Sequence, residues 1–310
     1  MGRVKIIQGN ALEALRGLED ESVHCVVTSP PYWGLRDYHV EGQLGLEPTP
    51  SKYVASLVAV FEEVRRVLRG DGTLWLNLGD SYASKPTGSR PGPTLNRRND
   101  TEEGPTGRPN KIVEGLKPKD LVGIPWLVAF AMRGAGWYLR QDVIWHKPNT
   151  LPEVVKDRPV SAHEHVFLFA KSERYFFDED AIKVRVKRTP RKVGHDGGMN
   201  DTGWNSKQAG SFGAPTGTRK SRSVWTIPTH CVRGAHFATF PRRLVEPCVK
   251  AGSPADGVVL DPFMGSGTTG IVALSLGRRF VGVELNPEYV ELARTRIASE
   301  TKFTRREATR

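Results

Sequence analysis

The chain has 310 residues, and its 45 Lys and Arg exceed its 34 Asp and Glu to give a formal net charge of +11. This length accommodates one large α/β domain with an insertion or two small domains, and a basic field attracts polyanions, so nucleic acid is the first partner to consider. No apolar run reaches the roughly 18 residues of a membrane span, no signal-peptide layout is present, and three cysteines without metal-site spacing predict reduced thiols. These features predict a cytoplasmic protein without a membrane partner or a bound metal.

Strand and helix patterns alternate through the first half of the chain. Runs rich in β-branched residues predict strands, and apolar positions spaced by three and four predict helices. The expected strands are residues 4–8, 23–28 and 73–78, and the expected helices are 11–17 and Tyr53 to Leu68. Residues 83–119 are rich in Pro, Gly and charge, which predicts a long mobile loop.

The same alternation continues in the second half. An apolar helix is expected to follow Pro125 and to end near Gly134. Further strands are expected at 137–145, 166–170, 257–260 and 279–284. A C-terminal helix follows, with Asn286 as its cap and Pro287 at its first position. This order predicts an α/β fold, a doubly wound and mostly parallel sheet with flexible insertions at its edge.

A glycine-rich turn lies between the last two predicted strands. Gly265, Gly267 and Gly270 fit the spacing G-x-G-x-x-G, and Glu284 follows 19 residues after the first of them. The glycines let the backbone approach a ligand closely, and a carboxylate after the next strand suits the ribose hydroxyls of an adenosine cofactor. The spacing does not separate NAD from S-adenosylmethionine. The carboxylate of Asp261 favours the latter, because it would repel a pyrophosphate and suits the ammonium group of a methionine.

A second turn, Ser29-Pro30-Pro31-Tyr32, follows the strand predicted at 23–28. On its own, this sequence is an ordinary turn. As a site, it offers the Ser29 hydroxyl and the Pro30 carbonyl as acceptors for the hydrogens of an exocyclic amine on a base. Such bonds favour a pyramidal nitrogen whose lone pair attacks a methyl group, without a metal or a covalent intermediate. Because a duplex hides the amine, the base must be flipped out, and Tyr32 is expected to stack on it.

These two turns, in this order, resemble the motifs of the permuted β group of amino-DNA methyltransferases, in which the catalytic half precedes the cofactor half. The resemblance rests on Ser29 to Tyr32 and Asp261 to Thr269 and covers nearly the whole chain. It implies a Rossmann-like, permuted methyltransferase fold and methyl transfer from S-adenosylmethionine to double-stranded DNA, with S-adenosylhomocysteine released. It also allows a homodimer and a separately encoded restriction endonuclease as partners.

The resemblance assigns roles to particular residues. Asn10 stands where the family has an Asp that contacts the cofactor's adenine, and its amide oxygen could accept the same hydrogen bond. Residues 236–241 resemble the segment along the methionine end of the cofactor. The expected cofactor-binding residues are Asn10, Thr239, Phe240, Asp261, Pro262, Phe263, Gly265, Ser266, Gly267, Thr268, Thr269 and Glu284. The expected catalytic residues are Ser29, Pro30, Pro31 and Tyr32.

The resemblance also divides the chain. The expected parts are a catalytic half at 1–184, a target-recognition region at 185–230, a cofactor-binding half at 231–300 and a basic tail at 301–310. Nine Lys or Arg and two Asp lie within 185–222, a net charge of +7, which suits phosphate contact; the alternative is a disordered basic linker. The residues expected to contact the target base or DNA are Trp33, Trp145, Lys147, Arg185, Lys187, Arg188, Arg191, Lys192, Arg219, Lys220 and Arg222.

The sequence leaves the target and the activity partly open. In the resembling family, Ser at the first position of the turn is mostly associated with cytosine N4 and Asp with adenine N6, so cytosine is favoured and adenine is the alternative. RNA as substrate, a DNA-binding protein without catalysis, and an NAD-dependent oxidoreductase built on the glycine turn are also compatible with parts of the sequence. His163-Glu164-His165 suggests a metal site, but no third ligand is evident and a structural role is favoured.

Overall fold

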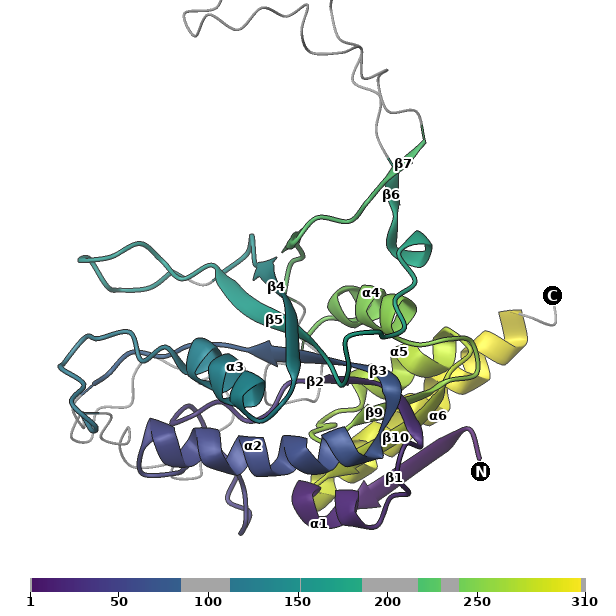
Figure 1. Ribbon diagram of the computed structural model, residues 1–310, viewed down its shortest axis with the longest axis horizontal. Helices are drawn as coiled ribbons and strands as arrows, with labels where there is room; N and C mark the ends of the chain where they lie inside the picture. The colour runs from purple at the N-terminus through teal and green to yellow at the C-terminus, as the bar shows by residue number, and fades with distance from the viewer. Residues whose placement is uncertain (1, 85–111, 151, 186–216, 230–239, 308–310) are drawn as a thin grey trace, which may run out of the picture.

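The structure, a computed structural model, describes residues 2–84, 112–150, 152–185, 217–229 and 240–307. Within these ranges the largest feature is an eight-stranded sheet in the order β1-β10-β9-β2-β3-β5-β4-β8 (Figure 1). Its strands are β1 (Val4–Gln8), β2 (Val23–Thr28), β3 (Leu68–Leu78), β4 (Tyr138–His146), β5 (His163–Ala170), β8 (Val224–Thr226), β9 (Val258–Asp261) and β10 (Arg279–Glu284).

The direction of the strands is mostly parallel, as predicted. The run from β1 through β10, β9 and β2 to β3 pairs in parallel throughout. β5 is antiparallel to both of its neighbours, β3 and β4, and β4 pairs in parallel with β8. The reversal of β5 brings its first residues to the edge of the sheet where β2, β3 and β4 end.

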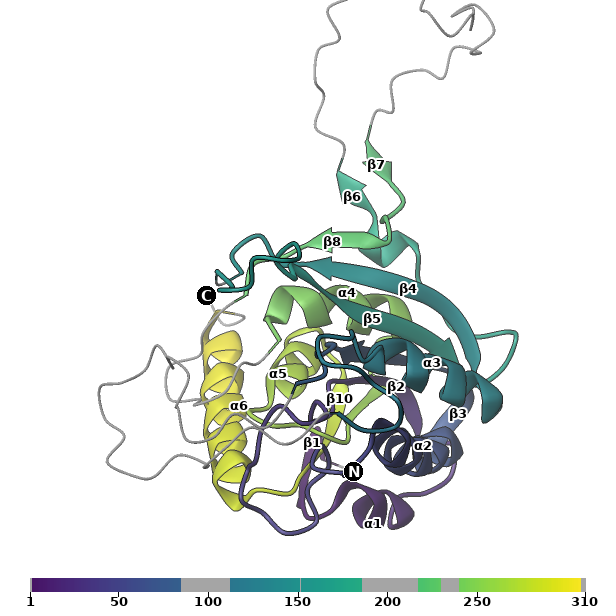
Figure 2. The same cartoon turned by 90° about the vertical axis from the view of Figure 1, so that its left-hand side faces the viewer.

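Helices cover both faces of the sheet (Figure 2). The helices are α1 (Ala11–Arg16), α2 (Pro50–Val67), α3 (Ile124–Gly134), α4 (Arg242–Gly252), α5 (Thr268–Ser275) and α6 (Pro287–Glu307), with a short 3-10 helix, η1 (Asp180–Ile182). Phe61 of α2 and Val128 of α3 belong to one hydrophobic core, and Val249 of α4 and Ile271 of α5 belong to a second core. The doubly wound α/β architecture is therefore confirmed.

Local sequence explains where the main helices begin. Thr49 caps α2 through its side chain, and Pro50 is the first residue of that helix. Helix α6 begins as predicted, with Pro287 as its first residue. The side chain of Asn286 accepts a hydrogen bond from the backbone N of Glu288 at 2.9 Å, as a helix cap should.

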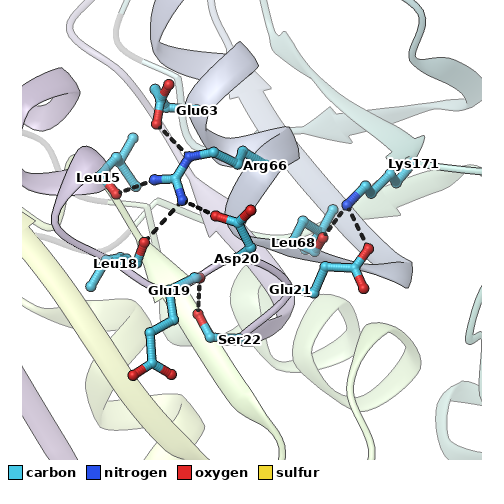
Figure 3. A network of polar contacts seen from close by, with 10 residues as sticks. All are labelled: Leu15, Leu18, Glu19, Asp20, Glu21, Ser22, Glu63, Arg66, Leu68 and Lys171. Atoms are coloured by element: carbon cyan, nitrogen blue, oxygen red, sulfur yellow. Dashed lines mark hydrogen bonds and ion pairs between the residues drawn. The ribbon is translucent and has the colours of Figure 1, made fainter.

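A polar network fastens the elements at the amino ends of β2 and β3 (Figure 3). Arg66 of α2 donates to the carbonyls of Leu15 (2.8 Å) and Leu18 (3.0 Å), which satisfies acceptors at the end of α1. Lys171, which follows β5, donates to the carbonyl of Leu68 at 2.7 Å. The acidic partners in this network are Asp20, Glu21 and Glu63. These contacts lie at the edge opposite to the carboxyl ends of the parallel strands.

Parts of the fold differ from the prediction. Helix α4 was not predicted, because Pro247 stands inside it and a proline removes a backbone donor from a helix. Strand β3 begins at Leu68, five residues before the strand expected at 73–78, so Gly70 and Gly72 lie inside it. Two short strands, β6 (Val184–Arg185) and β7 (Thr218–Arg219), were not expected at the basic stretch of residues 185–222.

Some predictions cannot be compared with the structure. Most of the loop predicted at 83–119 lies outside the described residues, and so does most of the basic stretch at 185–222. At the ends of that loop, Tyr82 and Leu121 form an antiparallel bridge. In the part of the chain that the structure describes, no helix is both long enough and apolar enough to cross a membrane.

Candidate active site

The two sequence motifs meet where the strand order reverses. From β2 the sheet continues to β3 on one side, whereas on the other side it passes through β9 and β10 to β1. In open α/β sheets, ligands bind outside the carboxyl ends of the strands at such a switch point. Ser29 follows β2 there, and Asp261 ends β9. The hydroxyl of Thr28 donates to Asp261 Oδ1 at 2.6 Å and joins the two motifs directly.

Asp261 is buried inside this junction, with 1% of its surface exposed. Its second oxygen accepts from the hydroxyl of Thr269 at 2.7 Å, and Oδ1 also accepts from the backbone N of Phe263 at 3.1 Å. Burial raises the pKa of Asp261 to about 6, against the lowering effect of these hydrogen bonds. The carboxylate therefore links β2, β9 and α5, and its expected contact with a ligand's ammonium group stays a prediction.

The glycine turn has one open side and one packed side. Gly265 and Gly267 adopt left-handed φ values of 51° and 81°. A Cβ on Gly265 would meet nothing within 4 Å, so a ligand can approach its backbone, whereas one on Gly270 would lie 2.6 Å from the ring of Phe280. Around them, buried residues of the turn hold its shape. These buried residues are Pro262, Ser266, Thr268 and Thr269, while Phe263 is partly exposed.

Glu284 lies beside the open side of this turn. Its two carboxylate oxygens accept from the backbone N of Gly265 at 2.8 Å and of Asn286 at 2.9 Å, and burial raises its pKa. Burial also raises the pKa values of Tyr38 and Tyr289, and the nearby charge of Glu284 adds to both shifts. A fixed carboxylate that is close enough to two tyrosines to raise their pKa values fits a ribose with vicinal hydroxyls. Sequence reasoning missed both tyrosines, because neither stands in a motif.

Other residues expected to bind the cofactor are placed differently. Asn10 caps α1: its amide oxygen accepts from the backbone N of Leu12 at 2.9 Å, and its amide nitrogen donates to the carbonyl of Gly42 at 3.4 Å. That oxygen is already engaged, so the predicted bond to adenine would have to share it. Phe240 is partly buried against the core beneath α4. Thr239 lies outside the described residues.

The Ser29–Tyr32 turn is held from three sides. The hydroxyl of Tyr53 donates to the carbonyl of Pro31 at 2.7 Å. The ring of Tyr32 lies against Gly79, just beyond β3, where a Cβ would come within 2.6 Å of the ring. The Tyr32 hydroxyl donates to Glu164 Oε2 at 2.7 Å. The turn is thus a rigid wall of the site.

A cluster of polar side chains stands behind the turn, and we call Ser29, Tyr32, Asn77, Lys147 and Glu164 the polar cluster. Asn77 Nδ2 lies 2.7 Å from Tyr32 Oη, 2.8 Å from Glu164 Oε2 and 3.4 Å from Ser29 Oγ. Ser29 Oγ donates to Tyr32 Oη at 3.4 Å, and Lys147 Nζ lies 2.7 Å from Glu164 Oε1. Burial raises the pKa of Tyr32 well above its usual range, and the charge of Glu164 adds to this.

Sheet topology explains why these residues meet. The strands β2, β3, β5 and β4 are consecutive neighbours, and Glu164 stands opposite Trp145 in the register. Because side chains alternate along a strand, Glu164 shares a face with Val166, and Asn77 shares one with Trp75; both apolar residues belong to the core beneath α4 and α5. Sequence reasoning missed Asn77 and Glu164. A lone acid at the start of an apolar strand was the available signal for Glu164.

Two residues expected to contact the base or DNA lie in the core, and their contact with a base stays a prediction. Trp33 is 3% exposed, and its indole N donates to the carbonyl of Glu47 at 2.8 Å. Trp145 is 4% exposed, and its indole N donates to the carbonyl of Ile227 at 2.8 Å. Both rings are core side chains. Lys147, by contrast, belongs to the polar cluster, where 17% of its side chain is exposed.

The basic residues of the expected recognition region that the structure describes lie away from this site. Arg185 and Arg219 are exposed on β6 and β7, which form a two-stranded ribbon beyond the β4–β8 edge (Figures 1 and 2). Lys220 and Arg222 are beside it in the chain, and Lys220 pairs with Glu179 at 2.8 Å. Four further residues, Lys187, Arg188, Arg191 and Lys192, lie outside the described residues.

The histidines of β5 contact each other and other side chains of the sheet. His165 pairs with Asp142 at 3.0 Å and stacks on Phe167. Within the described ranges, no group of three His, Cys, Asp or Glu side chains could hold a metal ion.

Known proteins share this sequence over nearly its whole length. A family model described as DNA methylase matches residues 23–295. The chain is 48% identical over 295 residues to the Type II methyltransferase M.XycI of Xanthomonas campestris pv. cyanopsidis, and the match covers 95% of this chain and 88% of that protein. It is 47% identical to the Type II methyltransferase M.SmaI of Serratia marcescens, with 94% and 90% covered.

Solved structures share the fold. The PvuII DNA methyltransferase, described as cytosine-N4-specific, superposes with a TM-score of 0.64 at 21% identity, covering 99% of this chain and 93% of that one. TTHA0409 of Thermus thermophilus, determined in complex with S-adenosyl-L-methionine, gives 0.58 at 27% identity, with 96% and 95% covered. With the family model spanning most of the sequence and close relatives along its length, the chain belongs to the N6/N4 DNA methylase family.

Proposed function

We propose that this protein transfers a methyl group from S-adenosylmethionine to the exocyclic N4 of cytosine in double-stranded DNA. One observation carries the proposal: the Ser29–Tyr32 turn and the glycine turn lie together at the switch point of the sheet, joined by the 2.6 Å bond from Thr28 to Asp261. An acceptor set for an amine therefore stands beside a nucleoside-type site.

The cofactor site is formed by the end of β9 and the end of β10. The open side of Gly265 and the carboxylate of Glu284 would hold the adenosine part, with Tyr38 and Tyr289 beside it. When bound, S-adenosylmethionine supplies a methyl group attached to a positively charged sulfur. The rest of the cofactor leaves as a neutral thioether, S-adenosylhomocysteine. The chain's own task is to orient the amine toward that methyl group and to exclude water.

The target base would enter between the two turns after flipping out of the duplex. The Ser29 hydroxyl and the Pro30 carbonyl accept the amine hydrogens, and the ring of Tyr32 supports the plane of the base. The contacts of Tyr32 with Gly79 and Glu164 fix that ring before the base arrives. Such fixed acceptors need little reorganisation during the reaction.

Serine at the first position of the turn favours cytosine N4 over adenine N6, following the association in the resembling family. Adenine N6 is the alternative, because the same acceptors suit either amine. The exposed basic ribbon of β6 and β7 lies in the region expected to read DNA, residues 185–230, and its charge suits phosphates. The Type II relatives support a separate cognate restriction endonuclease as a partner in the cell. The other parts of the division, with 1–184 as the catalytic half and 231–300 as the cofactor half, belong to the same proposal.

The test is to identify the methylated nucleoside. The protein is incubated with methyl-labelled S-adenosylmethionine and unmethylated, amplified DNA, which is then digested and analysed by mass. Label in N4-methylcytosine is the expected result. Label in N6-methyladenine would keep the methyltransferase and overturn the target base, and cofactor binding without label in several unrelated DNAs would contradict DNA as the substrate.

A further inference from the structure

Methylation of an amine leaves one proton to be removed. As the nitrogen lone pair bonds to the methyl carbon, the bond from carbon to sulfur breaks and its electron pair stays on sulfur. The positive charge then resides on the amine nitrogen, which carries one hydrogen too many. Ser29 accepts from that amine, but a serine hydroxyl cannot keep an extra proton at neutral pH. A further acceptor must therefore stand behind it.

The polar cluster contains a directed chain of hydrogen bonds that ends on such an acceptor. Ser29 Oγ donates to Tyr32 Oη at 3.4 Å, and Tyr32 Oη donates to Glu164 Oε2 at 2.7 Å. Each hydroxyl can accept a proton on one side and release its own on the other. The chain ends on a carboxylate with 15% of its side chain exposed, so the last link is shielded from solvent but not sealed.

Asn77 keeps the three oxygens in this order. Its Nδ2 faces Ser29 Oγ, Tyr32 Oη and Glu164 Oε2, and a flipped amide would direct a carbonyl oxygen at a carboxylate. Its own Oδ1 is buried and has no hydrogen-bond partner among the described residues. An unsatisfied buried acceptor is costly and calls for a reason. The reason here is that the amide serves the oxygens of the chain.

Lys147 is the counter-charge of the acceptor. Its ammonium lies 2.7 Å from Glu164 Oε1, on the side away from the bond to Tyr32, which uses Oε2. The groups that face Glu164 are thus the Tyr32 phenol beyond β2, the Asn77 amide of β3 and the Lys147 ammonium beyond β4. His163 and His165 lie on the other face of β5, where His165 stacks on Phe167.

We propose that Glu164 is the terminal acceptor of the proton lost by the target amine, and that Ser29 and Tyr32 carry the proton to it. The inference rests on the proposed methyl transfer. The amine proton passes to Ser29 Oγ, the Ser29 proton to Tyr32 Oη and the Tyr32 proton to Glu164 Oε2. Glu164 becomes a neutral acid, both hydroxyls are regenerated, and the acid later releases its proton to water.

The test combines Glu164→Gln with Tyr32→Phe, which keeps the ring but removes the middle link. Single-turnover methylation of amplified DNA is measured for wild type, each single variant and the double variant, and the affinity for S-adenosylmethionine is measured by calorimetry. Each single change should slow the reaction by about 100-fold, within the range of general acid–base effects. The double variant should be no slower than the slower single variant, because one broken chain cannot be broken twice. Cofactor affinity should stay within about twofold of wild type, since a proton path binds no cofactor.

Further variants separate the relay from a structural role. His163→Gln, one residue away on the opposite face, is the matched control and should behave as wild type. Glu164→Asp keeps the charge and should recover part of the rate.

The outcomes distinguish this inference from the proposed function. A wild-type protein that methylates no DNA would contradict the function itself. A wild-type protein that methylates DNA overturns the relay if Glu164→Gln loses less than about tenfold, if the two losses add, or if cofactor affinity falls in step with the rate. If Glu164→Gln fails to fold, the variants Tyr32→Phe and Glu164→Asp test the relay instead. The relay requires that Tyr32→Phe folds like wild type, binds S-adenosylmethionine with wild-type affinity and still transfers the methyl group slowly.

Discussion

One buried carboxylate holds the two halves of the site together. Asp261 accepts from Thr28 on β2 and from Thr269 on α5, so both motifs keep their relative position even without a ligand. A buried acid is costly to ionise, and burial raises its pKa to about 6 although the hydrogen bonds from these two threonines lower it. This residue therefore makes the stability of the protein depend on pH.

The direction of that dependence follows from proton binding. The folded protein holds the Asp261 proton more tightly than the unfolded chain, whose pKa is near 3.8, so the free energy of unfolding should fall as the pH rises from about 4 to about 6. The full effect is about 3 kcal/mol. Asp261→Asn cannot ionise, so its Tm relative to wild type should rise between pH 4.5 and pH 7. Glu284 is present in both proteins, so the effect of its own burial cancels in the comparison. A Tm difference that is constant with pH would contradict this role of Asp261.

The roles of Trp33 and Trp145 could not be read from the sequence, because the sequence does not show that both rings are buried. Trp33 and Trp145 stand beside recognisable motifs, and adjacency suggested a role in the pocket. In both, the indole N finds a backbone carbonyl inside the core. A tryptophan with a satisfied donor is a good core residue, and no pattern in the sequence separates that role from base stacking. Tyr32 differs because its hydroxyl meets a charged partner.

Most strands and helices could be predicted, but not which strands become neighbours. Alternating patterns and the cap at Asn286 located their elements within a few residues. The pairing of β5 between β3 and β4, and its reversed direction, depends on contacts between residues far apart in sequence. That pairing brings Lys147 and Glu164 to Asn77 and Ser29. The polar cluster therefore could not be predicted, whereas both turns could.

Gly79, just beyond the end of β3, leaves room for the ring of Tyr32 in the turn after β2. Gly79→Ala would place a Cβ within 2.6 Å of the Tyr32 ring, which cannot move freely because its hydroxyl is held by Glu164. Methyl transfer should fall at least tenfold, while cofactor affinity stays near that of wild type. Single-turnover rates and calorimetry measure the two effects.

Gly134→Ala is the matched control for that change. Gly134 ends α3, and a Cβ there would meet nothing within 4 Å. Alanine should leave activity unchanged and stabilise the helix by about 0.5–1 kcal/mol. If Gly79→Ala methylates DNA as fast as Gly134→Ala, the ring of Tyr32 is not a fixed wall of the site.

At the scale of the whole molecule, charge and chemistry occupy different places. The basic ribbon projects beyond the β4–β8 edge, whereas the candidate active site lies at the centre of the sheet (Figure 1). Replacing Arg219, Lys220 and Arg222 by Ala should weaken DNA binding and reduce its salt dependence, by about 0.9 in the logarithmic slope for each phosphate that is no longer neutralised. Fluorescence anisotropy at several salt concentrations measures this slope.

The control for that experiment uses basic residues elsewhere. Arg3, Lys5 and Arg16 are exposed near β1 and α1, on the opposite side of the molecule from the ribbon. Replacing these three by Ala removes the same charge and should change the slope less. An equal reduction in both triple variants would mean that net charge, and not the ribbon, governs binding.

The turn at the end of β2 is proposed to bind the amine of a base beside the glycine turn. Removing the Ser29 hydroxyl tests this proposal most directly. The measurement compares wild type with Ser29→Ala in single-turnover transfer of a labelled methyl group to DNA, with the labelled nucleoside identified by mass. We predict N4-methylcytosine from wild type, and a rate at least tenfold lower from Ser29→Ala with equal affinity for S-adenosylmethionine. Equal rates from the two proteins would contradict this, because the Ser29 hydroxyl would then play no part in the reaction.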